Sequence, residues 1–240
     1  MNPEAAKGYL PLAASIIRGK DIGTSEPKGY WDDGDRKADA IREASAEVQG
    51  VSVFRKKNRW ASFNDAPDHS IAEIAIEGPL MKAGECGEPG YQAFTDWIKE
   101  ADASPRIDGI LLRMDSPGGA VYGVATMADA IKSTTKPVIA FVDDGIAASA
   151  GYWLACHADE IVLSQTFSQV GSIGVFTTLA DWYGYFEKEG LKVKDVYARQ
   201  STDKNGDYRE ALEGNEDSLI DHLSALADTF ISTVKALGIY

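Results

Sequence analysis

The sequence predicts an α/β protein with a central, largely parallel β-sheet and helices packed outside it. From His69 onward, short apolar runs alternate with longer amphipathic segments. Short apolar runs indicate buried strands, whereas apolar residues repeated every three or four positions indicate helices. Regular alternation of the two is typical of α/β proteins. Sites in such proteins gather in loops beyond the carboxyl ends of the strands.

Ten segments make up this alternation. Strands are expected at residues 71–76, 107–114, 137–142, 160–163 and 193–198, where apolar side chains are consecutive or alternate. Helices are expected at residues 90–103, 121–133, 147–157, 179–189 and 213–237. In the first of these helices, Phe94, Trp97 and Ile98 have helical spacing.

The first 68 residues have a different character, with many charged residues and turn formers. Helical patterns occur at 9–18 and 36–48, and the basic run at 54–59 indicates a solvated turn. We therefore divide the chain into an N-terminal extension, residues 1–68, and a catalytic domain, residues 69–240. The extension is interpreted as a propeptide, an oligomerisation arm or a docking segment.

Composition narrows the class of protein. The 240 residues include 24 Lys and Arg against 37 Asp and Glu, for a net charge of −13, which argues against binding to nucleic acid. Two cysteines without metal-ligand spacing indicate a reducing compartment and no metal site. The sequence start lacks a basic signal-peptide region, and no stretch reaches the ~18 apolar residues of a membrane span. We expect a soluble, cytoplasmic protein without a membrane anchor.

Three motifs carry the candidate chemistry, although each is an ordinary turn when considered alone. DSPGG at 115–119 follows a buried strand, and its glycines permit positive φ and close approach of another backbone, whereas Asp115 is expected to cap the turn. In AASAGY at 147–152, Ser149 lies between small residues at a helix start, where free amides favour an oxyanion. The alternative role of Ser149 is that of a helix N-cap. The third motif, GSIGV at 171–175, indicates a turn that enters a strand.

The order and spacing of these motifs resemble the signal peptide peptidase A family and its relatives among phage prohead (capsid maturation) proteases. The similar stretches are IDGILLRMDSPGGAVYG, KPVIAFVDDGIAASAGYWLACHADEIV and QVGSIGVFTTLADWYGYFEKEGLKV. The resemblance implies the ClpP/crotonase-like fold of repeated β-β-α units, with Ser149 as nucleophile. It also implies an oxyanion hole formed by the amides of Gly118 or Gly119 and of Ala150. The family usually has glycine where Ala150 stands, and alanine there favours the phage branch.

The general base that Ser149 needs is not expected to be a histidine. His157 lies eight residues after Ser149 on the same predicted helix, ~12 Å away. The ClpP peptidase has its histidine about 25 positions after the serine, and this chain has none near Gly174.

The resemblance instead implies a lysine in a pattern like S-G-x-x-K after the strand at 193–198. Lys204 matches, although Ser201 replaces the glycine. Lys188, Lys192 and Lys194 are the alternatives. A lysine acts as a base when desolvation keeps it neutral near pH 7, and the resemblance implies that Ser172 orients it.

We therefore expect a serine endopeptidase with a Ser149–Lys204 dyad that requires neither a metal ion nor a cofactor. The resemblance favours a phage prohead protease that processes scaffold, portal or capsid proteins, and it implies self-association into a ring. A soluble bacterial protease like the signal peptide peptidases is an alternative, as is a catalytically inactive assembly scaffold of the same fold. A crotonase-like acyl-CoA hydratase or isomerase is a further alternative. It would need an acidic base in the site, and the motifs do not indicate one.

Overall fold

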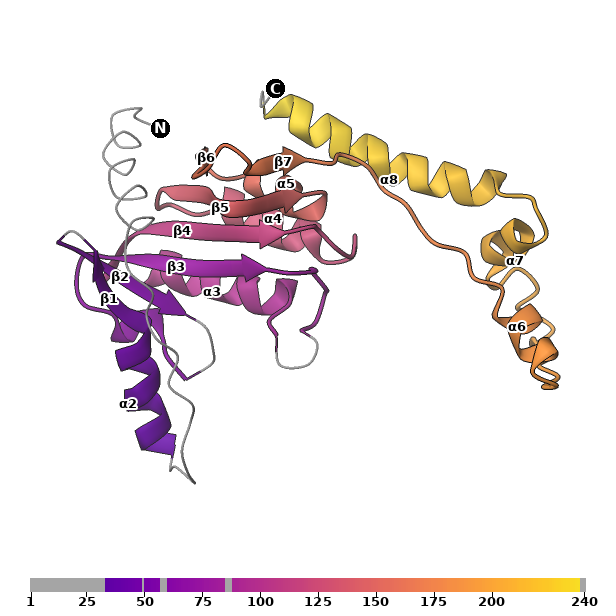
Figure 1. Ribbon diagram of the computed structural model, residues 1–240, viewed down its shortest axis with the longest axis horizontal. Coiled ribbons are helices and arrows are strands. Elements are labelled where there is room, and N and C mark those ends of the chain that lie inside the picture. Colours follow the sequence, from indigo (N-terminus) through magenta and orange to yellow (C-terminus); the bar gives the residue numbers. More distant parts are fainter. Residues whose placement is uncertain (1–32, 49, 57–59, 85–87, 238–240) are drawn as a thin grey trace. The chain divides into compact units, whose positions relative to one another are not determined.

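The computed structural model describes residues 33–48, 50–56, 60–84 and 88–237 (Figure 1). The chain forms two compact units, of which the first contains the described residues up to Ser172 together with Leu237, and the second spans Ile173–Ala236. The helix expected at 9–18 lies outside the described residues. In the described part of the chain, no helix combines the length and the apolar character that crossing a membrane requires.

The first unit is built on a seven-stranded sheet. Its strands are β1 (Ser45–Val48), β2 (Val51–Lys56), β3 (Ser70–Glu77), β4 (Ile107–Ser116), β5 (Val138–Ala148), β6 (Glu160–Leu163) and β7 (Gln169–Gly171). The order across the sheet is β1-β2-β3-β4-β5-β6, and β7 pairs with the last residues of β5. Only the β1–β2 pair is antiparallel among these strands. The α/β class with a largely parallel sheet is thereby confirmed.

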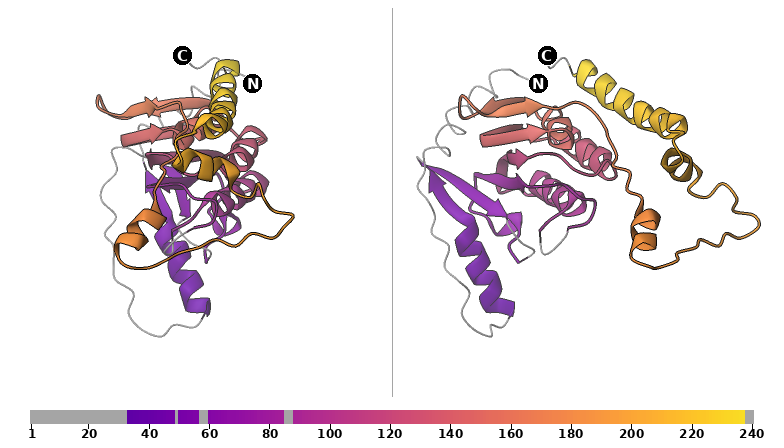
Figure 2. Two further views of the ribbon diagram at one scale, coloured as in Figure 1. Left: turned by 90° about the vertical axis from the view of Figure 1, so that its right-hand side faces the viewer. Right: turned by 45° about the vertical axis from the view of Figure 1, so that its right-hand side comes forward.

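Helices cover one face of this sheet (Figures 1 and 2). They are α3 (Tyr91–Ala103), α4 (Val124–Lys132) and α5 (Ala150–Ala155). Because successive strand residues point to opposite faces, alternate side chains such as Ile74 and Leu112 form one core cluster with helix residues such as Phe94 and Met127. This cluster fixes the strand ends from which the candidate site is built.

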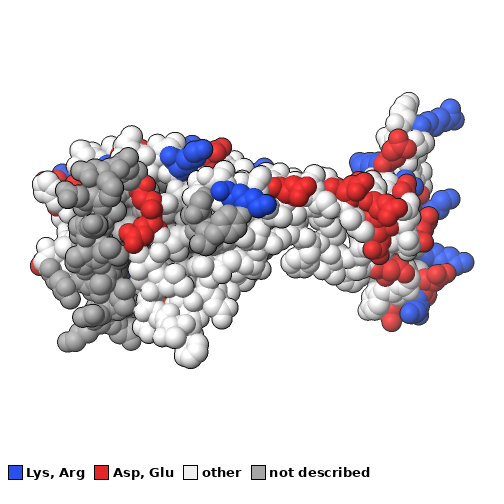
Figure 3. Space-filling model, turned by 90° about the horizontal axis from the view of Figure 1, so that it is seen from above, with Lys and Arg blue, Asp and Glu red and all other residues white. Residues whose placement is uncertain are grey.

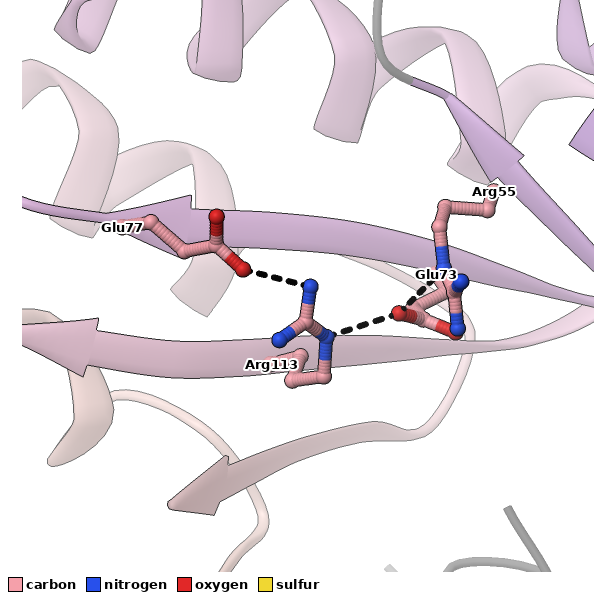
Figure 4. Close-up of polar contacts among 4 residues, drawn as sticks. All are labelled: Arg55, Glu73, Glu77 and Arg113. Atoms are coloured by element: carbon pink, nitrogen blue, oxygen red, sulfur yellow. Dashed lines mark hydrogen bonds and ion pairs between the residues drawn. The ribbon is translucent and has the colours of Figure 1, made fainter. Parts of the chain in front are cut away.

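The opposite face carries a small apolar cluster of Ile71, Leu111, Ile139 and Phe141 and, beside it, an ion-pair network. Figure 4 shows the network, which joins β2, β3 and β4. The buried Glu73 carboxylate accepts hydrogen bonds from Arg55 and Arg113, and Arg113 also donates to Glu77. Burial lowers the pKa of Arg113, but the two carboxylates outweigh burial, so that the net pKa is raised.

Two interpretations of the N-terminal part were wrong. The helical pattern expected at 36–48 ends early, since α2 (Asp33–Ala44) is followed directly by β1. The basic run beginning at residue 54 is not a solvated turn where the structure describes it, because Phe54, Arg55 and Lys56 belong to β2. Lys56 is buried and pairs with Glu100 of α3, so its charge is balanced by a partner distant in sequence.

The second unit contains α6 (Trp182–Lys188), α7 (Gly206–Leu212) and α8 (Asp217–Ala236). The strand expected at 193–198 is absent, since none of the described segments pairs with these residues and a strand requires such pairing. The helix α7 was not expected. This unit carries 12 Asp and Glu residues against seven Lys and Arg, and acidic side chains gather over it in Figure 3.

Candidate active site

Ser149 lies at a strained turn between β5 and α5. Its backbone has φ 52° and ψ −121°, a conformation that costs a residue with a side chain ~1–3 kcal/mol. The Ser149 amide donates to the Gly171 carbonyl of β7 at 2.8 Å, and its carbonyl accepts from the Trp153 amide of α5 at 2.9 Å. Strained strand-to-helix turns of this kind present the nucleophile in hydrolases. Two backbone hydrogen bonds therefore hold Ser149 in a conformation that it would not adopt alone.

The Ser149 side chain does not cap the helix that it precedes. Ser149 occupies the N-cap position of α5, but its hydroxyl makes no capping hydrogen bond. Within the described part of the chain, no other hydrogen bond to this hydroxyl is found, and the residue is partly exposed. The alternative role as a side-chain N-cap is therefore not supported, and the hydroxyl is available for chemistry.

Gly118 of the DSPGG turn lies directly against Ser149. Its φ is +98°, and a Cβ added there would lie 2.7 Å from Ser149 Cβ, 2.8 Å from the Ala148 carbonyl oxygen and 2.9 Å from the Ala150 nitrogen. Contacts this short do not occur for real side chains, so only glycine permits the approach. The first two sequence motifs thus meet in space, as the resemblance implied.

Hydrogen bonding distinguishes the two glycines of this turn. The Gly118 amide donates to Ser116 Oγ at 3.2 Å, and the Gly118 carbonyl accepts from the Leu80 amide at 2.8 Å. Gly119 is exposed, and its amide donates to no acceptor among the described residues. Ala150 is the first residue of α5, so its N–H has no acceptor within the helix. The amides of Gly119 and Ala150 therefore have no hydrogen-bond acceptor in the described structure.

Ser172 follows the residue that binds the Ser149 amide. It is exposed, and its φ of 57° places it in the left-handed region, as is the case for Ser149. The structure therefore brings the third motif to the second through the Gly171–Ser149 hydrogen bond. The role of Ser172 in orienting a base stays a prediction.

Lys204 belongs to the second unit, and the structure does not join it to the Ser149 group. It lies in a turn in which its amide donates to the Ser201 carbonyl at 3.3 Å, and Asn205 follows with φ 57°. Its side chain is exposed. The assignment of Lys204 as base consequently remains a prediction from the resemblance.

Neither histidine described in the first unit is hydrogen-bonded to Ser149. His157 Nδ1 lies 2.8 Å from the Trp153 carbonyl oxygen of its own helix, and His69 Nδ1 lies 3.0 Å from Asp108 Oδ2. His222 is part of α8 in the second unit. Among the residues that the structure describes, no group of three or more His, Cys, Asp or Glu side chains is arranged to hold a metal ion.

Sequence reasoning missed how Asp115 supports the site. Met114 of β4 pairs with Val142 of β5, and Ser116 pairs with Ala147, so residues 143–146 of β5 lie opposite Asp115 alone. The Asp115 carboxylate accepts from the Ile146 amide at 3.2 Å. Asp115 thus fastens the segment leading to Ser149, instead of capping its own turn. Only the spatial pairing of β4 with β5 reveals this role.

Two protease family models match the chain. The model of peptidase family S49 matches residues 130–237, and the Clp protease model matches residues 84–165. The two matches together include all three motifs, and the resemblance stated from the sequence is confirmed.

Several curated proteins are similar to the chain. The capsid assembly protease C of Escherichia phage lambda is 30% identical over 175 residues, which are 70% of this chain and 39% of that protein. The head-tail preconnector protein GP5 of Enterobacteria phage P21 is 33% identical, over 54% of this chain and 27% of that protein. A putative signal peptide peptidase SppA of Enterococcus faecium is 28% identical, over 52% and 38%. The chain spans less than two fifths of each of these relatives.

Proposed function

Since the chain is related to peptidase family S49, we propose that it is a serine endopeptidase in which Ser149 is the nucleophile and Lys204 the general base. One observation supports this above all others: Ser149 is held in a strained turn at a helix start, with Gly118 of the DSPGG turn packed against it. A turn that served only to join a strand to a helix would need neither the strain nor the contact. The strain and the contact are both explained if the Ser149 hydroxyl and the adjacent backbone amides act on one carbonyl group of a substrate.

The proposed reaction is acyl transfer followed by hydrolysis. The neutral Lys204 amine takes the Ser149 hydroxyl proton as the oxygen attacks the carbonyl carbon of the scissile peptide bond. The carbonyl oxygen becomes an oxyanion, which accepts hydrogen bonds from the Ala150 amide and from Gly119 or Gly118. The C–N bond then breaks, and the Lys204 ammonium returns the proton to the departing amine. Water, deprotonated by Lys204, releases the acyl group and restores Ser149.

Of the two glycines, Gly119 is the better candidate for the second oxyanion donor. The Gly118 amide already donates to Ser116 Oγ, whereas the Gly119 amide is unoccupied among the described residues. Two donors near the attacked carbonyl matter because the loss of one typically costs ~10²–10³-fold in rate.

The base assignment sets a condition on Lys204. An exposed lysine is protonated near pH 7, and only desolvation or a nearby positive charge makes it a base there. Lys204 is exposed in the single chain, so the proposal requires that it become desolvated when it acts. Ser172 is the proposed partner that orients its amine.

We propose self-association and a protein substrate of capsid assembly. The second unit exposes large apolar side chains, among them Phe176 and Val196 at 87% and Trp182 at 58%. Exposed apolar surface of this kind marks interaction sites, and it supports a homo-oligomer. The two phage relatives favour processing of scaffold, portal or capsid proteins, whereas the SppA relative favours the alternative of a bacterial peptidase acting on peptides.

Cleavage of a denatured protein, and of phage scaffold and capsid proteins, tests this function. We expect the wild-type chain to cleave and Ser149→Ala to lose at least ~10³-fold in rate. Lys204→Arg keeps the charge but cannot act as a base, so it should be equally inactive, while the matched control Lys194→Arg keeps wild-type activity. Activity retained in Ser149→Ala would refute the nucleophile, and activity retained in Lys204→Arg would refute the base. A folded wild type that cleaves nothing would favour the inactive scaffold.

A further inference from the structure

We propose that Ser116 is a positioning residue that fixes the glycine turn of the site, a role that rests on the proposed function. Ser116 is the second residue of DSPGG and is fully buried. A buried hydroxyl is retained only where its hydrogen bonds are satisfied, since an unsatisfied one costs ~1–3 kcal/mol. Its partners therefore show which parts of the structure it joins.

The Ser116 hydroxyl joins two backbone segments. It donates to the Gly78 carbonyl at the end of β3 at 2.7 Å, and it accepts from the Gly118 amide at 3.2 Å. The first bond ties Ser116 to the neighbouring strand, and the second sets the direction of the Gly118 peptide. Because Gly118 is the residue packed against Ser149 Cβ, any rotation of this peptide changes the contact with the nucleophile.

Ser116 also lies beside the helix that begins at Ser149. A Cβ added at Gly151 of α5 would lie 3.4 Å from the Ser116 carbonyl oxygen and 3.7 Å from Ser116 Oγ. The same side chain thus bonds to the strand end and to the glycine turn, and it lies next to the first turn of α5. With the Gly118 amide held by Ser116, the next amide, that of Gly119, is the one without an acceptor in the described structure. We infer that Ser116 aligns the two proposed oxyanion donors.

The chain contains a matched control for this proposal. Ser104 has 1% exposure, donates to the Phe63 carbonyl at 3.0 Å and accepts from the amide two residues later, that of Arg106, at 3.4 Å. Ser116 makes the same pair of bonds, including one to the amide two residues later. The two serines differ in location, because Ser104 is the C-cap of α3 and hydrogen-bonds to none of the site residues in the described structure. Removal of either hydroxyl should therefore lower stability to a similar extent.

The test measures how fast a small serine-reactive fluorophosphonate modifies Ser149, with the maximal rate and the half-saturating concentration determined separately. We expect Ser116→Ala to lower the maximal rate roughly 10- to 100-fold with little change in half-saturation, since small misplacements of reacting groups have effects of this size. Ser104→Ala should stay within about twofold of wild type, by the same reasoning. Ser116→Thr, which keeps the hydroxyl, should recover most of the rate.

Each remaining outcome has a defined meaning. Equal rates for Ser116→Ala and Ser104→Ala would overturn the positioning role, as would a Ser116→Thr variant as slow as Ser116→Ala. If Ser116→Ala does not fold, Ser116→Cys replaces it, because the thiol keeps the volume and is only a weak hydrogen-bond donor. A wild-type protein that is not modified at Ser149 would overturn the proposed function itself, and the Ser116 role with it.

Discussion

Replacing Gly118 with alanine tests the contact between the two central motifs. The backbone at φ +98° costs an alanine ~1–2 kcal/mol. The added methyl group would meet three Ser149-region atoms at 2.7–2.9 Å, and overpacking of this kind costs a further ~1–3 kcal/mol. We therefore expect the free energy of unfolding to fall by ~2–5 kcal/mol. Because relief of the contacts requires Ser149 to shift, its modification by a fluorophosphonate should slow by ~10²-fold.

Gly214→Ala is the control that separates the cost of backbone strain from the cost of the short contacts made by Gly118→Ala. Gly214 has a nearly identical φ of +96°, but a Cβ added there would meet no atom of the described residues within 4 Å. Its replacement should cost only the ~1–2 kcal/mol of backbone strain and leave the modification rate unchanged. Urea unfolding and labelling kinetics of both variants decide the matter. If Gly118→Ala matched Gly214→Ala in both measurements, the argument that Gly118 packs tightly against Ser149 would be refuted.

Three further predictions concern other parts of the first unit. Glu73→Gln should lower the free energy of unfolding by ~2–3 kcal/mol, which is less than for a fully buried pair because the arginines that bind Glu73 are partly exposed. The control Glu77→Gln, at an exposed carboxylate, should lower it by under ~1 kcal/mol. Equal losses for the two variants in urea titrations would contradict this prediction. Gly145→Ala should strongly lower the free energy of unfolding, because the new Cβ would lie 2.3 Å from Asp115 Oδ1. Adding Asp115→Ala to this variant should recover part of the lost free energy. Additive effects of the two substitutions in a double-mutant cycle would disprove the clash. Burial raises the pKa of the Cys156 thiol, so the unfolded chain loses this proton first, and stability should fall as pH rises above the unfolded pKa of ~8.5. Cys156→Ala should show a shallower decline between about pH 8 and 10, and an unchanged slope would rule out this contribution.

Local sequence patterns were sufficient for several strands of the sheet. The strand expected at 160–163 has the bounds of β6, and those expected at 71–76 and 107–114 lie within β3 and β4. β3 and β4 form apolar runs in the sequence because core clusters lie on both sides of the sheet, whereas β6 is a partly exposed edge strand. Parallel pairing was predictable because helices separate the strands along the chain.

The wrong secondary-structure predictions share one cause, which is that they depend on contacts between residues distant in the sequence. β2 was taken for a solvated turn because Arg55 and Lys56 are charged, and their carboxylate partners Glu73 and Glu100 come much later in the sequence. The segment 193–198 has a strand-like composition, but no strand forms there without a partner. Composition alone does not reveal whether a pairing partner exists.

The candidate site was predictable in part, because its motifs are local. Ser149 and Gly118 were named from two separate turns, and the structure places them in contact. The supporting roles of Asp115 and Ser116 were not predictable, since each depends on the register between strands. The assignment of Lys204 as base rests on the resemblance alone, because Lys204 belongs to the other unit.

Mapping the residue that a serine-reactive phosphonate modifies tests the central claim most directly. The measurement is mass spectrometry of peptides from wild-type protein, Ser149→Ala and Lys204→Arg after equal exposure to the reagent. The account predicts one adduct, on the peptide that contains Ser149, which is absent from Ser149→Ala and strongly reduced in Lys204→Arg. An adduct on another serine, or none on folded wild-type protein, would contradict the assignment of Ser149 as an activated nucleophile.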